Sequence, residues 1–301
     1  MSTEVSAPAA APIETGADGA ATVGRHHRAR SPLLIIGLSL VGLMVVVALF
    51  APLLTSYDPR AITGRALETP TGRHWLGTDV PGRDIFAQLV YGTRASLIAA
   101  VVAGSLAMLG AILIGVLPAM LNRTADAVAN RVVVFLLALP GLPLLVVIGA
   151  LAGNNQMVLI LVIAFVGAAP NARILRSQAL ALRDRGFIGA ARGFGGGSGY
   201  VLRRHVVPAM GPLVLIGFVY WASVAVGLQA GLAFLGLGDP SGVSWGQMLN
   251  RALTQQGIYF SPMWTWWVLP PGLAITLTLL GFTFIGVALE PSFNPRWRRS
   301  S

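Results

Sequence analysis

The sequence contains neither cysteine nor lysine, and all of its 21 basic residues are arginine. The absence of cysteine excludes disulfides, thiolate metal sites and cysteine nucleophiles. The absence of lysine excludes Schiff-base chemistry and a phosphate-binding loop that ends in Gly-Lys-Ser or Gly-Lys-Thr. Gly-x-Ser-x-Gly and His-Glu-x-x-His motifs are missing as well. We therefore expect no catalytic residue and no metal site in this chain.

Charge is also scarce, because only 11% of the residues are charged whereas 55% are hydrophobic. Soluble domains carry about 25% charged residues. Mean hydropathy is +0.73, which predicts an all-α integral membrane protein. The net charge of +10 does not indicate nucleic-acid binding, because the arginines alternate with long uncharged spans instead of gathering on one soluble face.

The uncharged stretches predict how often the chain crosses the bilayer. A crossing helix needs about 20 apolar residues, and a charge at the membrane centre costs about 2.5–3.5 kcal/mol on insertion scales. About six transmembrane helices are therefore predicted near residues 33–54, 95–119, 132–152, 157–172, 211–235 and 264–287. The first follows a long polar stretch and is itself long, so we expect an uncleaved helix and not a signal peptide. Five prolines are expected to kink or break helices: Pro140, Pro143, Pro170, Pro270 and Pro271.

The distribution of arginine predicts the orientation. With the N-terminus in the cytoplasm, 15 arginines lie inside and 6 outside. This asymmetry predicts a multi-pass protein of the cell membrane with both termini cytoplasmic. The predicted organisation is a disordered cytoplasmic tail (1–30), a transmembrane helix (31–58), an extracytoplasmic segment (59–90), a transmembrane core (91–290) and a basic cytoplasmic tail (291–301).

A glycine-rich segment divides the core, at residues 193–199 within the cytoplasmic loop 177–208. A phosphate cradle would need a preceding strand and a lysine, and neither is present. The alternative is a helix over 177–192 that ends at the glycines, followed by a second short helix over 199–207 that stops at Pro208. Small residues at 189–191 would let another protein approach closely.

This segment resembles the coupling loop of ABC importer permeases. The match consists of Ala190-Ala191, then Gly195, then Arg204-His205-Val206-Val207-Pro208. Further segments resemble the peptide/nickel branch of that family, in its second permease subunit of the dipeptide and oligopeptide type. They are residues 74–84 (HWLGTDVPGRD), 91–97, 234–238, 244–249 and 266–278, and together the resemblance covers about residues 31–296.

The resemblance implies a type I ABC importer transmembrane domain that forms half of a translocation pathway for short peptides. It also implies the partners: a homologous second permease, two ABC ATPases that bind ATP and Mg²⁺, an extracytoplasmic solute-binding protein and the lipid bilayer. This chain itself would need no cofactor and would bind no nucleic acid. The residues that would seat the ATPase are Gly189, Ala190, Ala191, Arg192, Gly195, Arg204, His205 and Pro208. The basic members of this set, with Arg203, either contact an acidic ATPase rim or only anchor the loop at the membrane.

The sequence departs from the family at several polar positions. Gly189 stands at the acidic position of the coupling loop, and Val134, Gln229 and Val287 stand where acids are usual. Thr283 and Ala209 replace asparagines. The lost acids therefore leave two questions for the structure: whether this chain makes the family's usual polar contacts within the membrane, and whether it transports the family's usual substrate. Nickel or another small solute is the alternative cargo, and no substrate-binding residue can be assigned.

Two other classes of function remain. A secondary carrier without ATP commonly needs ionisable groups within its spans, and these spans nearly lack them. A membrane scaffold would not need an ATPase-docking loop.

Outside the loop, we expect Asp79, Arg83 and Asp84 to form a turn with a salt bridge, and not to contact substrate. The tryptophans at 245, 264, 266 and 267 are expected to be interfacial anchors.

Overall fold

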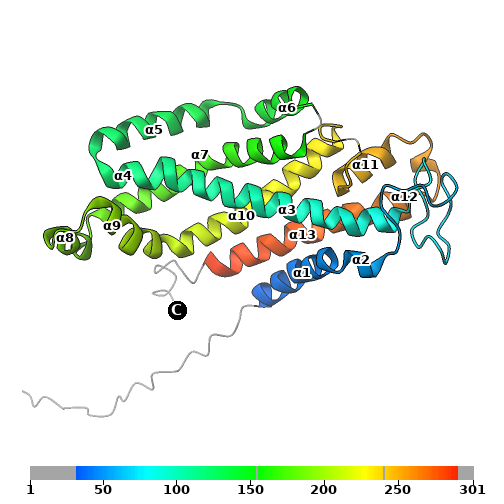
Figure 1. Ribbon diagram of the computed structural model, residues 1–301, viewed down its shortest axis with the longest axis horizontal. Helices are drawn as coiled ribbons and strands as arrows, with labels where there is room; N and C mark the ends of the chain where they lie inside the picture. The colour runs from blue at the N-terminus through cyan, green and yellow to red at the C-terminus, as the bar shows by residue number, and fades with distance from the viewer. Residues whose placement is uncertain (1–31, 154, 240, 291–301) are drawn as a thin grey trace, which may run out of the picture. The chain divides into compact units, whose positions relative to one another are not determined.

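The computed structural model of the protein describes residues 32–290 apart from Asn154 and Pro240. The predictions for the two tails, residues 1–30 and 291–301, lie outside the described residues. The described part is mostly helical and contains no strand. Figure 1 shows the helices running side by side, with α8 and α9 at one end and α2 and α11 at the other.

Within residues 32–290, as far as the structure describes them, five helical stretches are long and apolar enough to cross a membrane. They are α1 (Pro32–Leu49); α3 (Ile85–Ala111) with η1 (Ile112–Val116) and α4 (Leu117–Leu121); α7 (Gln156–Arg183); α9 (Ser198–Val201) with η2 (Leu202–Val206) and α10 (Val207–Phe234); and α12 (Trp264–Trp267) with α13 (Leu269–Leu289). A sixth, broken stretch consists of α5 (Arg123–Ala138) and α6 (Gly141–Leu151), bent by 80°. The shorter helices are α2 (Ala51–Leu54), α8 (Gly186–Gly193), α11 (Trp245–Leu253) and the 3₁₀ turn η3 (Ile258–Phe260). The prediction of about six transmembrane helices is confirmed.

The break between α5 and α6 confirms the prediction that Pro140 interrupts the span expected near 132–152. Leu139 has an extended backbone (φ −72°, ψ 132°), and Pro140 is the N-cap of α6. A residue before proline is disfavoured in the α conformation, so the helix ends there. Pro170 behaves differently, because α7 continues through it.

Small residues bring the central helices together. The fully buried side of α3 is largely alanine, with Ala99, Ala103 and Ala107 at 0–1% exposure. The pair α1 and α13 meets through glycines: a Cβ on Gly37 would lie 2.8 Å from the Gly281 carbonyl oxygen. In lipid, where burial of apolar surface gives little driving force between helices, such close backbone approach is what lets helices attract.

Two π-helical segments precede prolines at the same spacing. In η1 the Leu117 N–H bonds the Ile112 carbonyl, and Pro118 follows; in η2 the Val207 N–H bonds the Leu202 carbonyl, and Pro208 follows. Proline lacks an N–H and its ring clashes with carbonyls one turn back. The wider turn relieves that clash. This corrects the prediction that a short helix stops at Pro208, because α10 continues through it to Phe234.

The segment 55–84 is held by acids acting on neighbouring backbone and side chains. Asp84 caps α3 by accepting from Ala87 N–H at 2.6 Å and lies 2.8 Å from His74 Nδ1. Asp79 accepts from the Arg83 N–H at 2.7 Å and from Gln88 Nε2 at 3.0 Å. The turn role is as expected, but within the described residues no ion pair joins Arg83 to either acid.

Two of the four tryptophans expected at the interface are core residues instead. Trp245 is 0% and Trp267 1% exposed. The Trp245 indole N–H donates to the Leu89 carbonyl at 3.1 Å, and its ring packs on Gly92 of α3. Trp264 remains exposed at 44%.

Candidate functional site

The predicted coupling loop begins later than expected. Residues 177–183 complete the last turns of α7, and the chain turns at Asp184 before α8 starts at Gly186. The prediction of one helix over 177–192 is therefore wrong in its first part. The reason is packing, because Leu175 and Ala179 of α7 are buried against the η1–α4 region and keep that helix regular.

Two arginines fix the end of α7 from which α8 starts. Arg176 makes two hydrogen bonds to Asp126 of α5, at 2.6 and 2.8 Å. Arg183 donates from Nη1 to the Ala119 carbonyl of α4 at 3.2 Å. A guanidinium matches a carboxylate in this two-bonded geometry, which orients as well as attracts. The start of α8 is thereby tied to two other helices.

The glycine run ends α8 in a Schellman motif. Gly195 has φ +86°, a left-handed conformation that L-residues with a side chain rarely adopt. The Gly196 N–H bonds the Ala191 carbonyl at 2.9 Å, which is the six-to-one bond of this motif. A Cβ on Gly196 would lie 2.5 Å from that same carbonyl oxygen. Glycine is thus required at both positions, for two different reasons.

One side of α8 is buried and the other faces outward. Ile188 is 0% exposed and packs in a cluster with Leu175, Val201 and Val206. On the outward side Gly189 and Ala190 are exposed. Among the described side chains, Ile188 and the partly buried Ala191 therefore seat the helix, while Gly189 and Ala190 leave small residues at the surface.

The structure places three of the other predicted site residues around a surface pocket. Ala191, Gly195 and His205 line it, together with Phe187, Phe194, Gly196, Gly197 and Tyr200. Arg204 and Pro208 are exposed nearby in the chain but do not line the pocket, and the side chain of Arg192 lies outside what the structure describes.

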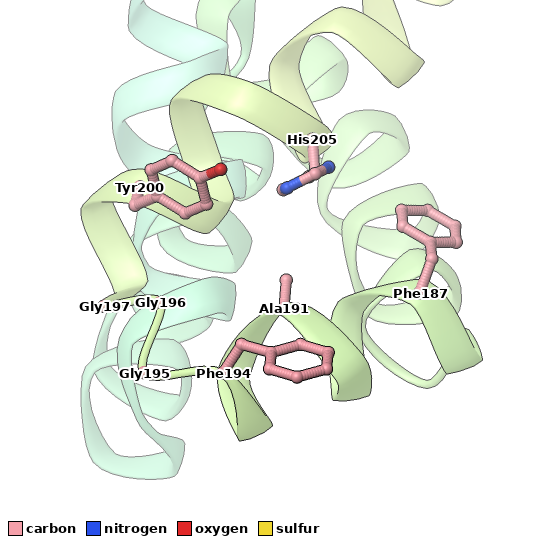
Figure 2. A pocket seen from close by; sticks show the side chains of 8 residues that line it. All are labelled: Phe187, Ala191, Phe194, Gly195, Gly196, Gly197, Tyr200 and His205. Atoms are coloured by element: carbon pink, nitrogen blue, oxygen red, sulfur yellow. The ribbon is translucent and has the colours of Figure 1, made fainter.

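Figure 2 shows this pocket, a space of about 600 Å³ between α8 and the α9–η2 turn. His205 points into it between the rings of Phe187 and Tyr200, at centroid distances of 6.2 and 5.7 Å. Phe194 is 93% exposed. Exposed apolar side chains that gather around a pocket are typical of interaction sites. The sequence analysis missed these aromatic residues, although three large aromatics in a loop of Gly, Ala and Arg are a readable signal.

The residues at which acids are usual in the family form no shared site. Val134 and Val287 are exposed apolar side chains, at 57% and 48%. Gln229 is 4% exposed, and its Oε1 has no hydrogen-bond partner in the described part of the chain.

Comparison with known proteins decides the class of the molecule. Residues 111–299 match the family of binding-protein-dependent transport system inner membrane components. The chain belongs to this family. Residues 29–70 also match the N-terminal transmembrane domain of oligopeptide transport permease C. The permease is therefore the membrane component of an ABC importer and a multi-pass inner membrane protein, and the carrier and scaffold alternatives are set aside.

Relatives of the permease align along most of its length. A dipeptide transport system permease protein of Alkalihalophilus pseudofirmus is 33% identical over 89% of this chain and 88% of its own. A glutathione transport system permease protein of Pectobacterium atrosepticum is 31% identical over 84% of each chain. An oligopeptide transport system permease protein of Bacillus subtilis is 29% identical over 89% of this chain and 87% of its own.

Proposed function

We propose that this permease forms half of the pathway of an ATP-driven importer for short peptides. The names of three relatives support this cargo, since they refer to dipeptides, oligopeptides and the tripeptide glutathione. None of these three names refers to nickel, the alternative considered from the sequence. A homologous permease supplies the other half of the pathway, and an extracytoplasmic binding protein delivers the peptide.

The segment 177–208 transmits ATP-driven motion through α8. The observation that carries this proposal is the two-sided character of α8, with Ile188 fully buried and Gly189 and Ala190 exposed. One side of α8 packs against the bundle, and the other side carries small residues. A second protein can therefore bind α8 closely without displacing it from the bundle. Two ATPase subunits bind ATP and Mg²⁺, and one of them receives α8.

The orientation follows from the same assignment. If α8 meets a cytoplasmic ATPase, then the opposite end of the bundle, with α2 and α11, is extracytoplasmic (Figure 1). The excess of arginine on the α8 side of the membrane, 15 against 6, supports this direction and puts both termini in the cytoplasm.

Cargo is tested by uptake into proteoliposomes that contain the permease, its partner permease and the ATPases, with the binding protein and ATP supplied. We expect accumulation of a labelled dipeptide that depends on ATP. Accumulation of Ni²⁺ without any uptake of di-, tri- or oligopeptides would refute the peptide assignment.

Docking is tested by two changes that leave the transmembrane helices alone. Gly195→Val puts a β-branched side chain on a left-handed residue, and Ala190→Trp puts bulk on the exposed side of α8. Both variants should insert normally yet lose uptake and ATPase co-purification. Normal uptake in both would refute the assignment of α8 to the ATPase.

A further inference from the structure

A second pocket lies at the end of the bundle opposite α8. Its volume is about 590 Å³, within the range of small-molecule sites. Its walls come from the chain after α2, the first half of α3, the N-terminus of α7 and the loop between α10 and α11. The lining side chains used below are Tyr57, Asp58, Arg60, Tyr91, Arg94 and Asp239.

This pocket contains two acids and two arginines that do not pair with one another. Within the described residues, no ion pair joins Asp58 or Asp239 to Arg60 or Arg94. Opposite charges that only stabilise a fold would be expected to meet directly. Here both signs are presented separately to one space, so a ligand that pairs with all four side chains carries both signs itself.

Hydrogen bonds hold each charged side chain in place but use only some of its oxygen atoms or N–H groups. Asp58 Oδ1 accepts from the Arg60 N–H at 2.8 Å, and Arg60 Nε donates to the Ser241 carbonyl at 3.3 Å. Arg94 donates from Nε to the Ala48 carbonyl at 2.5 Å and from Nη2 to the Leu49 carbonyl at 3.2 Å.

Asp239 Oδ1 accepts from the Ser241 N–H at 2.9 Å and from its hydroxyl at 2.6 Å. These hydrogen bonds hold the pKa of Asp239 below its usual range, with a smaller contribution from the charge of Arg60, so the carboxylate is ionised at neutral pH. Asp58 Oδ2 and the remaining N–H groups of Arg60 and Arg94 have no hydrogen-bond partner within the described protein, whereas the Gly242 N–H also contributes to lowering the pKa of Asp239.

The aromatic residues complete the pocket. Tyr57 and Tyr91 line it, and the Arg94 guanidinium carbon lies 5.6 Å from the Tyr91 ring centre. This stacking leaves the Arg94 side chain with little freedom. Charges fixed before a ligand arrives lose little entropy on binding.

We propose that this pocket binds a small zwitterion, with its ammonium against Asp58 and Asp239 and its anionic group against Arg60 and Arg94. A short peptide with free termini has this chemistry, and the pocket then receives cargo at the end of the bundle where it enters. A phospholipid with an ethanolamine headgroup has the same two charges. The assignment to cargo rests on the proposed peptide importer.

The test is saturation-transfer NMR on the complete membrane complex in nanodiscs of phosphatidylglycerol, with dialanine as the probe. Dialanine with free termini should receive saturation, and N-acetyl-dialanine amide, which lacks both charges, should not. The double variant Asp58→Asn, Asp239→Asn keeps the acceptor atoms but removes both charges. We expect it to weaken dialanine binding about tenfold.

Matched variants separate this result from a general loss of charge or fold. Glu290→Gln removes an exposed carboxylate at the C-terminus of α13 and should leave dialanine binding unchanged. Equal saturation of dialanine in the wild type and the double variant would overturn the assignment of this pocket as the binding site.

Nanodiscs that also contain phosphatidylethanolamine distinguish the two sources. If that lipid binds and dialanine does not bind in either membrane, the assignment to cargo is overturned and the headgroup is the ligand. Peptide uptake by the wild-type importer is scored separately. If dialanine does not bind this pocket but peptide uptake is normal, the binding site is refuted and the proposed function is not.

Discussion

Asp126 and Arg176, fifty residues apart, form a two-bonded ion pair between α5 and α7, with contacts of 2.6 and 2.8 Å. The pair lies two turns before α7 ends at Arg183, close to where α8 leaves the bundle. Both side chains are largely shielded, with 24% and 15% exposure for the arginine and the acid. The pair links the last part of α7 directly to α5, the first half of the broken span.

Removal of the pair should destabilise the permease. Asp126→Asn leaves a partly buried guanidinium without its anion, which costs about 1–3 kcal/mol. We expect a lower thermal midpoint in detergent, with partial recovery when Asp126→Arg is combined with Arg176→Asp. Asp184→Asn is the control, because its contact with Arg183 is 3.9 Å long and the acid is 82% exposed. An equal loss in both single variants would contradict a specific role of the pair.

Gly195 has a left-handed backbone, so uptake by variants at this position should depend on how well the new residue tolerates that conformation. Such a residue costs about 1–2 kcal/mol for most side chains and less for asparagine. Uptake should therefore fall in the order Gly195→Asn, Gly195→Ala, Gly195→Val. Gly197 has φ −66°, so Gly197→Ala should transport normally. Loss of transport in Gly197→Ala as severe as in Gly195→Val would show that glycine composition, and not the turn, matters.

Gly196 is restricted by space and not by its own torsion. A methyl group there meets the Ala191 carbonyl oxygen at 2.5 Å, whereas nothing lies within 4 Å of a Cβ on Gly199. Gly196→Ala should break the bond that closes α8, and the amides of residues 186–196 should exchange with deuterium faster. Gly199→Ala should leave exchange unchanged. Protection that is unaltered in both variants would mean that α8 does not depend on this bond.

The absence of cysteine makes the orientation directly testable. Phe194→Cys and Ile62→Cys place single thiols at positions that are 93% and 70% exposed, at opposite ends of the bundle. An impermeant maleimide should label Ile62→Cys in intact cells and Phe194→Cys only after permeabilisation. Ile188→Cys, at 0% exposure, should resist labelling in both conditions. The reverse pattern for the two exposed sites would invert the proposed topology.

Apolar length and arginine spacing were enough to predict the number of spans, because in a membrane both are direct energetic requirements. They did not predict how prolines act. Pro140 ends a helix, whereas Pro170 and Pro208 lie within helices that continue. A helix can continue through a proline if the preceding turn widens or if the carbonyl groups that lose their N–H donor find other hydrogen-bond partners. The residues next to the proline do not show whether either happens.

The same limit explains the tryptophans and the candidate site. Trp245 is buried because Gly92, distant in sequence, leaves room for its ring. The glycine run indicated a turn at 193–199, but only the fold shows that Gly195 and Gly196 differ from Gly197. The pocket at Asp58 and Asp239 brings together four separate segments, and no spacing within the sequence could have joined them.

The two π segments have a consequence for how this chain can vary in length. Each holds one more residue in its turn than an α-helix does. Loss of a single residue from Ile112–Val116 or Leu202–Val206 would return that turn to ordinary α-helix and keep the flanking side chains facing their old neighbours, at the cost of a clash with the proline that follows. The same deletion inside α7 would rotate everything beyond it by about 100° about the helix axis. The ends of these two spans are thus the places where loss of one residue would leave the rest of the bundle in register.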